Sequence, residues 1–298
     1  MSDRVLIFGG SGMLGHKLSQ VLSKQSDSYV TLRDKGTAAS YPQFFEGARI
    51  IEGVDALDAQ SISRAFDEAR PDVVVNSIGV VKQLDSSKDA VISIGVNSLF
   101  PHRLADLCAL HGARLITIST DCVFSGARGN YKESENPDCE DLYGRSKMLG
   151  EVQSGDALTI RTSIIGRQIH GSHALLEWFL SQRGGCVKGY TKAIFTGWPT
   201  LILSEIIADI IARHRDLKGI IHIPSNPISK FDLLTLIRDK FGLNIEIEPS
   251  DHLDCNRSLN GELFKKLTGF ETPTWDNLVS RMYDDQASYA VPAQLSLK

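Results

Sequence analysis

The sequence has few cysteines, and they form no pattern that predicts a covalent or metal framework. Its five cysteines are an odd number, and no two of them form a Cys-x-x-Cys pair. A disulfide scaffold and a zinc knuckle are therefore not expected, and this cysteine use fits a reducing cytoplasm. No set of histidines, cysteines and carboxylates has the spacing of metal ligands, so we expect no bound metal.

The sequence also lacks an excess of basic residues and a long hydrophobic run. Its 298 residues include 32 Lys and Arg against 36 Asp and Glu, a net charge of -4. This balance argues against a nucleic-acid partner and against binding to a membrane surface. The most apolar stretch, 193–212, contains Glu205 and Asp209, and the first residues lack the pattern of a signal peptide. We therefore expect no membrane span and a cytoplasmic location.

The first half of the sequence alternates short apolar runs with longer helical patterns. Helical spacing of apolar residues is found over 13–22, 59–69 and 89–111, the last bent at Pro101. Runs rich in Val, Ile and Leu predict buried strands at 5–8, 29–32, 49–51, 73–75, 114–118 and 158–160. This alternation predicts an α/β fold, a Rossmann-type doubly wound parallel sheet with helices on both faces.

The second half is less regular and predicts a smaller C-terminal α/β lobe for substrate binding. We expect the Rossmann domain to comprise residues 1–165 and about 190–225. The lobe would comprise residues 166–189 and about 226–286. Periodicity is lost beyond this point, so we expect residues 287–298 to form a flexible tail.

A glycine-rich turn follows the first strand. Gly9, Gly12 and Gly15 are spaced Gly-x-x-Gly-x-x-Gly between this strand and the first helix. A tight turn and close approach to a pyrophosphate both require residues without a Cβ, and the helix N-terminus attracts phosphate charge. A glycine-rich turn without a ligand is the alternative. Its position between a strand and a helix favours dinucleotide binding.

The end of the second strand selects between two dinucleotides. A carboxylate there would bind the 2′-hydroxyl of NAD, whereas a cation would bind the 2′-phosphate of NADP. The strand ends with Leu32, Arg33 and Asp34. Arg33 favours NADP(H), while Asp34 leaves NAD(H) open; a solvated surface arginine is the third interpretation.

A hydroxyl, a phenol and an ammonium form a candidate catalytic group. Tyr143 and Lys147 are four residues apart and share a helix face, where Lys147 would lower the pKa of the Tyr143 phenol. Thr120 follows the fifth strand, at the sheet edge where ligands bind. Its hydroxyl could polarise a carbonyl oxygen while a tyrosine protonates it. Tyr-x-x-x-Lys alone is common by chance, but these features and the glycine turn support each other.

These motifs resemble those of the extended short-chain dehydrogenases/reductases, and more narrowly of the dTDP-4-dehydrorhamnose reductase family. The matching segments are 9–15, 119–124, 143–147 with 150–151, and looser stretches as far as Leu259. The resemblance implies NADPH-dependent reduction of the 4-keto group of a 6-deoxyhexose linked to dTDP or UDP, in surface-polysaccharide synthesis. It implies catalytic roles for Thr120, Tyr143 and Lys147.

The resemblance also implies which residues bind cofactor and substrate. Asn97 resembles a helix asparagine that supports the active site, with an exposed polar residue as the alternative. Arg257 would hold the substrate diphosphate, with a structural salt bridge as the alternative. The expected substrate residues are Val81, Asp121 and Arg257. The expected cofactor residues are Gly9, Ser11, Gly12, Met13, Leu14, Gly15, Arg33, Asp55, Asn76, Ser77, Gly79 and Lys147.

Departures from the family pattern leave the sugar unidentified. Cys122 stands where the family usually has an aromatic residue, and Ile164 and Ile165 follow a segment after which a tryptophan is common. Cys122 also replaces the glutamate of 4,6-dehydratases, which argues against dehydration. Two alternatives stay open, a nucleotide-sugar epimerase and a non-catalytic regulator resembling the methionine adenosyltransferase β subunit. A homodimer is compatible with the sequence.

Overall fold

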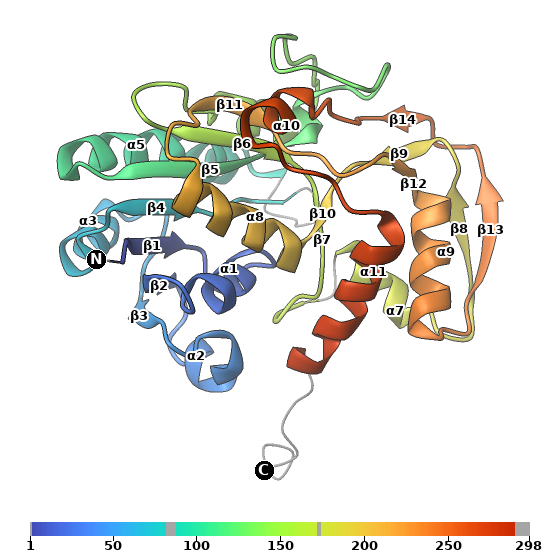
Figure 1. Ribbon diagram of the computed structural model, residues 1–298, viewed down its shortest axis with the longest axis horizontal. Helices are drawn as coiled ribbons and strands as arrows, with labels where there is room; N and C mark the ends of the chain where they lie inside the picture. Colours follow the sequence, from blue (N-terminus) through green and yellow to red (C-terminus); the bar gives the residue numbers. More distant parts are fainter. Residues whose placement is uncertain (1, 82–87, 172–173, 290–298) are drawn as a thin grey trace.

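A seven-stranded parallel sheet forms the centre of the computed structural model, which describes residues 2–81, 88–171 and 174–289 (Figure 1). Its strand order is β11-β6-β5-β4-β1-β2-β3. The strands are β1 (Arg4–Phe8), β2 (Asp27–Leu32), β3 (Arg49–Glu52), β4 (Val73–Asn76), β5 (Arg114–Thr120), β6 (Leu158–Thr162) and β11 (Gly219–His222). The order reverses between β1 and β4, so the loops that follow these two strands meet at the carboxyl edge, where open α/β sheets bind ligands. The expected doubly wound fold is confirmed.

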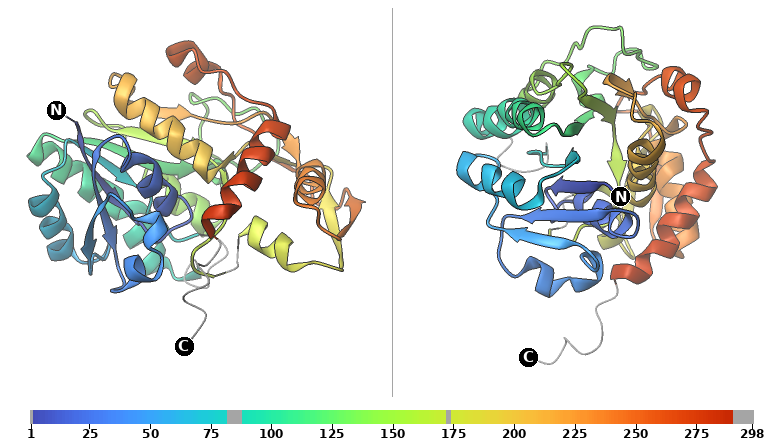
Figure 2. Two further views of the ribbon diagram at one scale, coloured as in Figure 1. Left: turned by 60° about the horizontal axis from the view of Figure 1, so that its bottom comes forward. Right: turned by 60° about the vertical axis from the view of Figure 1, so that its left-hand side comes forward.

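Helices cover both faces of this sheet because alternate strand residues point to opposite sides. The main covering helices are α1 (Gly15–Leu22), α3 (Ala59–Ala69), α5 (Phe100–His111), α6 (Leu142–Leu149) and α8 (Thr200–Arg213). Val5 and Ile7 of β1 belong to the apolar cluster that contains α1 and α8. Leu6 and Phe8 belong to the opposite cluster, with α3 and α5. The right-hand view of Figure 2 shows these two helical layers.

The long helical pattern over 89–111 is broken into three consecutive parts. Helix α4 (Ala90–Ser93) continues into a π-helical turn (Ile94–Leu99), and α5 follows. Pro101 lies in the first turn of α5. Because proline has no N–H and its ring crowds the carbonyl one turn earlier, the wider turn before it relieves both problems.

The smaller lobe is built on short strands whose partners are distant in sequence. Strand β9 pairs with β12 and β14, and β8 pairs with β13. After β9 the chain returns to the large sheet through α8, which covers it, and β11, its edge strand. The elements are α7 (Leu175–Ser181), β8 (Cys186–Tyr190), β9 (Ala193–Phe195), β12 (Ile228–Ser229), α9 (Lys230–Phe241), β13 (Glu246–Ser250), β14 (Cys255–Asn256), α10 (Glu262–Thr268) and α11 (Trp275–Asp284).

Short elements complete the described chain. They are α2 (Thr37–Ser40), a 3-10 helix at Pro42–Phe44, another at Asp121–Val123, β7 (Ile164–Ile165), β10 (Trp198–Pro199) and a last 3-10 helix at Asp285–Tyr289. One apolar cluster extends from Val5 in the sheet to Met282 in α11, so sheet and lobe share a core. Of the expected tail, residues 287–289 belong to the last 3-10 helix, and 290–298 lie outside the described residues. Within the described ranges, no helix has the length and apolarity to cross a bilayer.

Candidate active site

The glycine turn after β1 has a backbone that only glycine allows. Gly9 has a φ of +90°, and its carbonyl accepts the N–H of Gly12 at 2.9 Å. A Cβ on Gly15 would lie 1.9 Å from the Gly9 oxygen, and one on Gly10 would lie 2.2 Å from a methyl carbon of Val30. These close approaches bring the start of α1 against the sheet. A turn of this geometry at a helix N-terminus fits the pyrophosphate of a dinucleotide.

Residues within this turn differ in what they present to a ligand. Ser11, Gly12 and Met13 are partly exposed, whereas the Leu14 side chain is buried in the core. A contact from Leu14 would therefore come from its backbone N–H.

Arg33 lies just beyond β2, where the sequence analysis placed it. It forms a loose ion pair with Asp34 at 3.7 Å, and both side chains are 71% exposed. A solvated pair of this kind is weak, so the guanidinium remains available to a phosphate. After the next strand, Asp55 is half-buried and accepts the N–H of Leu57 at 2.8 Å.

Asn76 and Ser77 use their side chains to join strands. The amide nitrogen of Asn76 donates to the hydroxyl of Thr117 at 3.1 Å, and the Ser77 hydroxyl donates to the carbonyl of Phe8 at 2.6 Å. These bonds fix the carboxyl ends of β4, β5 and β1 relative to one another. A contact from Asn76 or Ser77 to a cofactor would therefore come from their backbone.

Asn97 connects the loop after β4 to the candidate catalytic helix. Its side chain is 1% exposed, so the interpretation as an exposed residue is wrong. Its amide oxygen accepts the N–H of Val80 at 2.9 Å, and its amide nitrogen donates to the Ser146 hydroxyl at 3.1 Å. A Cβ on exposed Gly79 would lie 3.4 Å from Asn97 Oδ1 and 3.7 Å from Lys147 Nζ. The π-helical turn thus brings Gly79, Asn97 and Lys147 together.

Helix α6 packs directly against the turn that follows Thr120. Asp141 caps the helix by accepting the N–H of Gly144 at 2.8 Å. A Cβ on Gly144 would lie only 2.4 Å from the carbonyl oxygen of Cys122. This contact places Tyr143 beside Thr120, close enough for a hydrogen bond from the Thr120 hydroxyl to influence the phenol.

The electrostatics of the tyrosine differ from the sequence prediction. Burial and the neighbouring Cys122 and Asp121 raise the pKa of Tyr143, and the hydrogen bond with Thr120 only partly offsets them. The predicted lowering by Lys147 is therefore wrong, because Lys147 Nζ donates to the carbonyl of Ile118 at 2.7 Å. Burial lowers the pKa of Lys147 to about 8. The site thus holds a firmly protonated phenol beside a buried amine.

The substrate side of the site contains one buried carboxyl and two cations. Burial raises the pKa of Asp121, while hydrogen bonding from Cys122 and the charges of Arg257 and Lys230 oppose the rise. Arg257 also donates to the carbonyl of Phe124 at 2.8 Å. Burial alone would lower the Arg257 pKa, but Cys122, nearby Cys255 and Asp121 raise it instead. Two cations from the lobe therefore act on the edge that carries Thr120.

Lys230 was missed by the sequence analysis, although the sequence contained a signal. It is the first residue of α9, directly after the N-cap Ser229. A cation in this place opposes the helix dipole, which suggests a role outside the helix. Val81, the remaining predicted substrate residue, is 43% exposed on the loop after β4. That loop continues into residues outside the described ranges.

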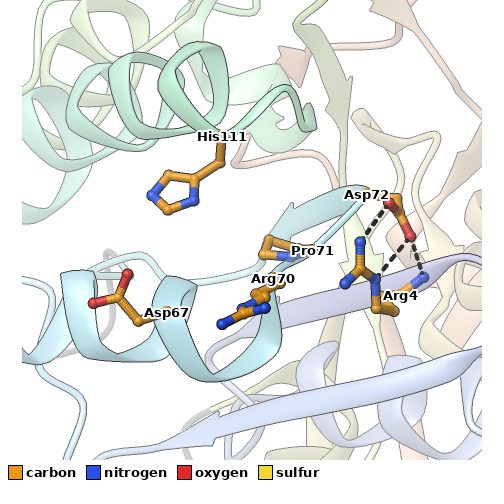
Figure 3. A pocket seen from close by; sticks show the side chains of 6 residues that line it. All are labelled: Arg4, Asp67, Arg70, Pro71, Asp72 and His111. Carbon is orange, nitrogen blue, oxygen red and sulfur yellow. Dashed lines mark hydrogen bonds and ion pairs between the residues drawn. The ribbon is translucent and has the colours of Figure 1, made fainter.

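A hollow of about 460 Å³ lies at the opposite edge of the sheet (Figure 3). It is lined at the amino ends of β1 and β4, whereas Thr120 ends β5 at the carboxyl edge. Arg4 in this hollow is held by Asp72 through side-chain hydrogen bonds of 3.2 and 3.0 Å. The hollow is therefore separate from the candidate catalytic group.

Curated proteins of known name resemble part of this chain. A dTDP-4-dehydrorhamnose reductase of Streptomyces griseus is 31% identical over 149 residues, 50% of this chain and 43% of that protein. The methionine adenosyltransferase 2 subunit beta of Rattus norvegicus is 30% identical over 152 residues, 50% of this chain and 42% of that protein. The chain thus spans less than half the length of each of these relatives.

A solved structure extends the likeness to nearly the whole chain. The dTDP-4-dehydrorhamnose reductase of Bacillus anthracis in complex with NADP superposes with a TM-score of 0.78 at 21% identity, covering 96% of this chain and 100% of that one. At this identity the likeness shows the fold. The family model described as RmlD substrate binding domain matches residues 3–288, so the chain belongs to that family.

Proposed function

We propose that the protein is an NADPH-dependent reductase of the 4-keto group of a nucleotide-linked 6-deoxyhexose. The observation that carries the proposal is the placement of Thr120, Tyr143 and Lys147 at one sheet edge with the glycine turn. Relatives named as dTDP-4-dehydrorhamnose reductases, and the NADP complex of one of them, support this chemistry. Arg33 favours the phosphorylated dinucleotide.

The three catalytic residues divide the work of reducing a ketone. The nicotinamide, when bound, supplies a hydride to the carbonyl carbon. Tyr143 donates its proton to the carbonyl oxygen, and its raised pKa keeps that proton in place until the oxygen becomes basic. Thr120 donates a hydrogen bond to the same oxygen. Lys147 Nζ, which donates to the carbonyl of Ile118, would hold the nicotinamide ribose through its positive charge.

The lobe supplies the charge that a nucleotide diphosphate requires. Arg257 is half-buried beside the catalytic turn, and Lys230 acts on the same Asp121 carboxyl. Arginine binds phosphate oxygens in a bidentate manner, and lysine adds a point charge. An ionised Asp121 would repel a diphosphate placed close to it. We therefore infer that Arg257 and Lys230 lie between Asp121 and the bound diphosphate.

Turnover of NADPH with dTDP- and UDP-linked 4-keto-6-deoxyhexoses tests the proposal. The wild-type protein should oxidise NADPH faster than NADH with one of these sugars. Tyr143→Phe should reduce kcat by about 10²–10⁴-fold because the proton donor is lost. Tyr283→Phe alters an exposed phenol on α11 and should match the wild type.

A second candidate is a non-catalytic, dinucleotide-binding regulatory subunit. It is favoured by the 30% identity to the methionine adenosyltransferase 2 subunit beta. NADPH binding without turnover of either sugar, unchanged by Tyr143→Phe, would support this candidate. A search for a co-purifying enzyme would then be the next step.

A further inference from the structure

The last described turn of the chain lies against the helix that follows the glycine turn. It is the 3-10 helix Asp285–Tyr289, and its Tyr289 hydroxyl lies 2.6 Å from Nε2 of His16. Nδ1 of the same imidazole lies 2.8 Å from the carbonyl oxygen of Gly12. His16 is 0% exposed. A buried ring therefore connects the C-terminal turn to the glycine turn through two hydrogen bonds.

These two hydrogen bonds fix the position of the imidazole proton. A carbonyl oxygen only accepts, so Nδ1 carries the hydrogen that is donated to Gly12. Nε2 is then the acceptor, and the Tyr289 phenol is the donor. Burial lowers the pKa of His16 to about 3 and raises that of Tyr289, so both groups are neutral at physiological pH. Tyr289 thus selects the tautomer that holds the Gly12 carbonyl.

The buried ammonium of Lys17 fixes the position of the C-terminal turn Asp285–Tyr289. Lys17 Nζ donates to Asp285 at 2.7 Å, to Ser288 at 3.1 Å and to Gln20 at 2.9 Å. It also lies 4.5 Å from the centre of the Tyr289 ring. Lys17 is 0% exposed, so three acceptors and an aromatic face replace its hydration. This docking places the Tyr289 hydroxyl at His16.

The Gly12 carbonyl controls the direction of the next N–H group. In a planar trans peptide, the carbonyl of Gly12 and the N–H of Met13 point in opposite directions. The Gly12 carbonyl accepts the His16 backbone N–H at 3.2 Å and the His16 imidazole at 2.8 Å, so the Met13 N–H points away from the imidazole. N–H groups of this turn are the donors that a pyrophosphate requires.

We propose that His16 and Tyr289 are positioning residues of the dinucleotide site, and that docking of the turn Asp285–Tyr289 sets its affinity for the dinucleotide. The inference rests on the proposed use of NADPH. Both side chains act through the backbone of the glycine turn, and the C-terminal turn therefore forms part of the cofactor site even though it lies at the other end of the sequence.

Tyr289→Phe tests the proposal directly, because it removes the phenol donor and keeps the ring. The Kd for NADPH, measured by fluorescence titration, should rise about threefold to tenfold, the range expected for one hydrogen bond. The kcat at saturating NADPH should stay near the wild-type value. Tyr131→Phe is the control, since Tyr131 is fully buried and its phenol oxygen likewise takes part in a hydrogen bond, accepting the N–H of Arg128 at 3.2 Å. Its Kd for NADPH should be unchanged.

His16→Asn separates positioning from general stability. The asparagine amide nitrogen stands where Nδ1 stands and still donates to Gly12, but it cannot reach Tyr289. His16→Asn should keep most of the NADPH affinity, and adding Tyr289→Phe should cause no further loss. In addition, ¹⁵N NMR of the imidazole without cofactor should show one tautomer in the wild type and a mixture in Tyr289→Phe.

The outcomes distinguish this inference from the proposed function. Wild-type protein that binds no NADPH would overturn both. Wild-type binding with the same Kd in Tyr289→Phe, or an unchanged tautomer, would overturn the positioning role alone. An additive loss in the double variant would also overturn it, because the two residues would then act independently.

Discussion

Lys147 has a charge state that depends on its surroundings in the range near neutral pH. It is 8% exposed, and burial lowers its pKa to about 8, although Glu151 partly opposes this effect. At pH 7 about nine-tenths of the amine is therefore still protonated. Because the proposed chemistry needs the ammonium, the site operates just below the pH at which it would lose that charge.

We expect kcat/KM for ketone reduction to fall as pH rises through about 8. The lowered pKa means that Lys147 is charged below this pH and neutral above it, and kcat/KM reports the free enzyme. The profile should approach a tenfold loss for each further pH unit. Lys147→Arg keeps its charge at every accessible pH, so its lower activity should show no such fall. A wild-type profile that stays flat to pH 10 would contradict the assignment.

Residue identities could be predicted from the sequence better than residue environments. Tyr143 and Lys147 were proposed from their spacing, since a helix places residues four apart on one face, and Thr120 from its position after the fifth strand. The direction of the Tyr143 pKa shift was not found, because it depends on burial and on Cys122 and Asp121 beside the ring. Spacing indicates which groups meet but says nothing about how much water remains around them.

At the scale of elements, the contact between α6 and the turn after β5 determines the geometry of the proposed catalytic group. Gly144 makes this contact possible, since a Cβ there would lie 2.4 Å from the carbonyl of Cys122 and 2.7 Å from Cβ of Cys139. Helix propensity alone would favour alanine over glycine by about 1 kcal/mol. The clash opposes this gain, because α6 has to shift away from a turn held at Thr120 and Cys122.

Gly144→Ala should therefore lower kcat by about 10- to 100-fold while leaving NADPH affinity near the wild-type value. A shift of about 1 Å in Tyr143 is enough for such a loss. Steady-state kinetics and NADPH titration on one preparation measure both quantities. Arg145→Ala changes the next residue of the same helix, which is exposed, and should leave kcat nearly unchanged. Full activity in Gly144→Ala would show that α6 tolerates displacement.

Elements of the large sheet could be predicted because each carries its own apolar run or helical period. The π-helical turn Ile94–Leu99 could not, because the pattern over 89–111 fits a bent α-helix equally well. Strands of the lobe were harder still. Strand β9 finds its partners in β12 and β14, which lie far along the chain, and the last two have only two residues each. Such pairings depend on the assembled core rather than on local sequence.

At the scale of the whole molecule, a buried ion pair joins the two ends of the described chain. Lys17 of α1 pairs with Asp285 after α11 at 2.7 Å, and the side chains are 0% and 15% exposed. Because Lys17 is more deeply buried than Asp285, removing Asp285 and removing Lys17 have different consequences for stability. Loss of Asp285 leaves an ammonium without a countercharge in the core. Loss of Lys17 leaves a carboxylate that water can reach.

Asp285→Asn should therefore destabilise the protein by about 3–5 kcal/mol, and Lys17→Met by less than about 1.5 kcal/mol. Chemical denaturation followed by circular dichroism compares the two. Glu271→Gln is the control, because the side chains of Lys265 and Glu271 in this ion pair are 61% and 78% exposed, and such pairs contribute at most about 1 kcal/mol.

The pH dependence of Asp285→Asn gives the same argument a second test. Burial already lowers the pKa of Lys17 in the wild type, and the charge of Asp285 opposes that effect. Without Asp285 the folded-state pKa falls further below the unfolded value, so unfolding takes up a proton between the two values. Stability then rises with pH across that range. The loss of stability in Asp285→Asn relative to the wild type should consequently become smaller between pH 7 and pH 10. A deficit that stays constant would mean that Lys17 keeps its charge in the variant, held by Gln20, Ser288 and the Tyr289 ring, and that the C-terminal turn remains docked without the ion pair.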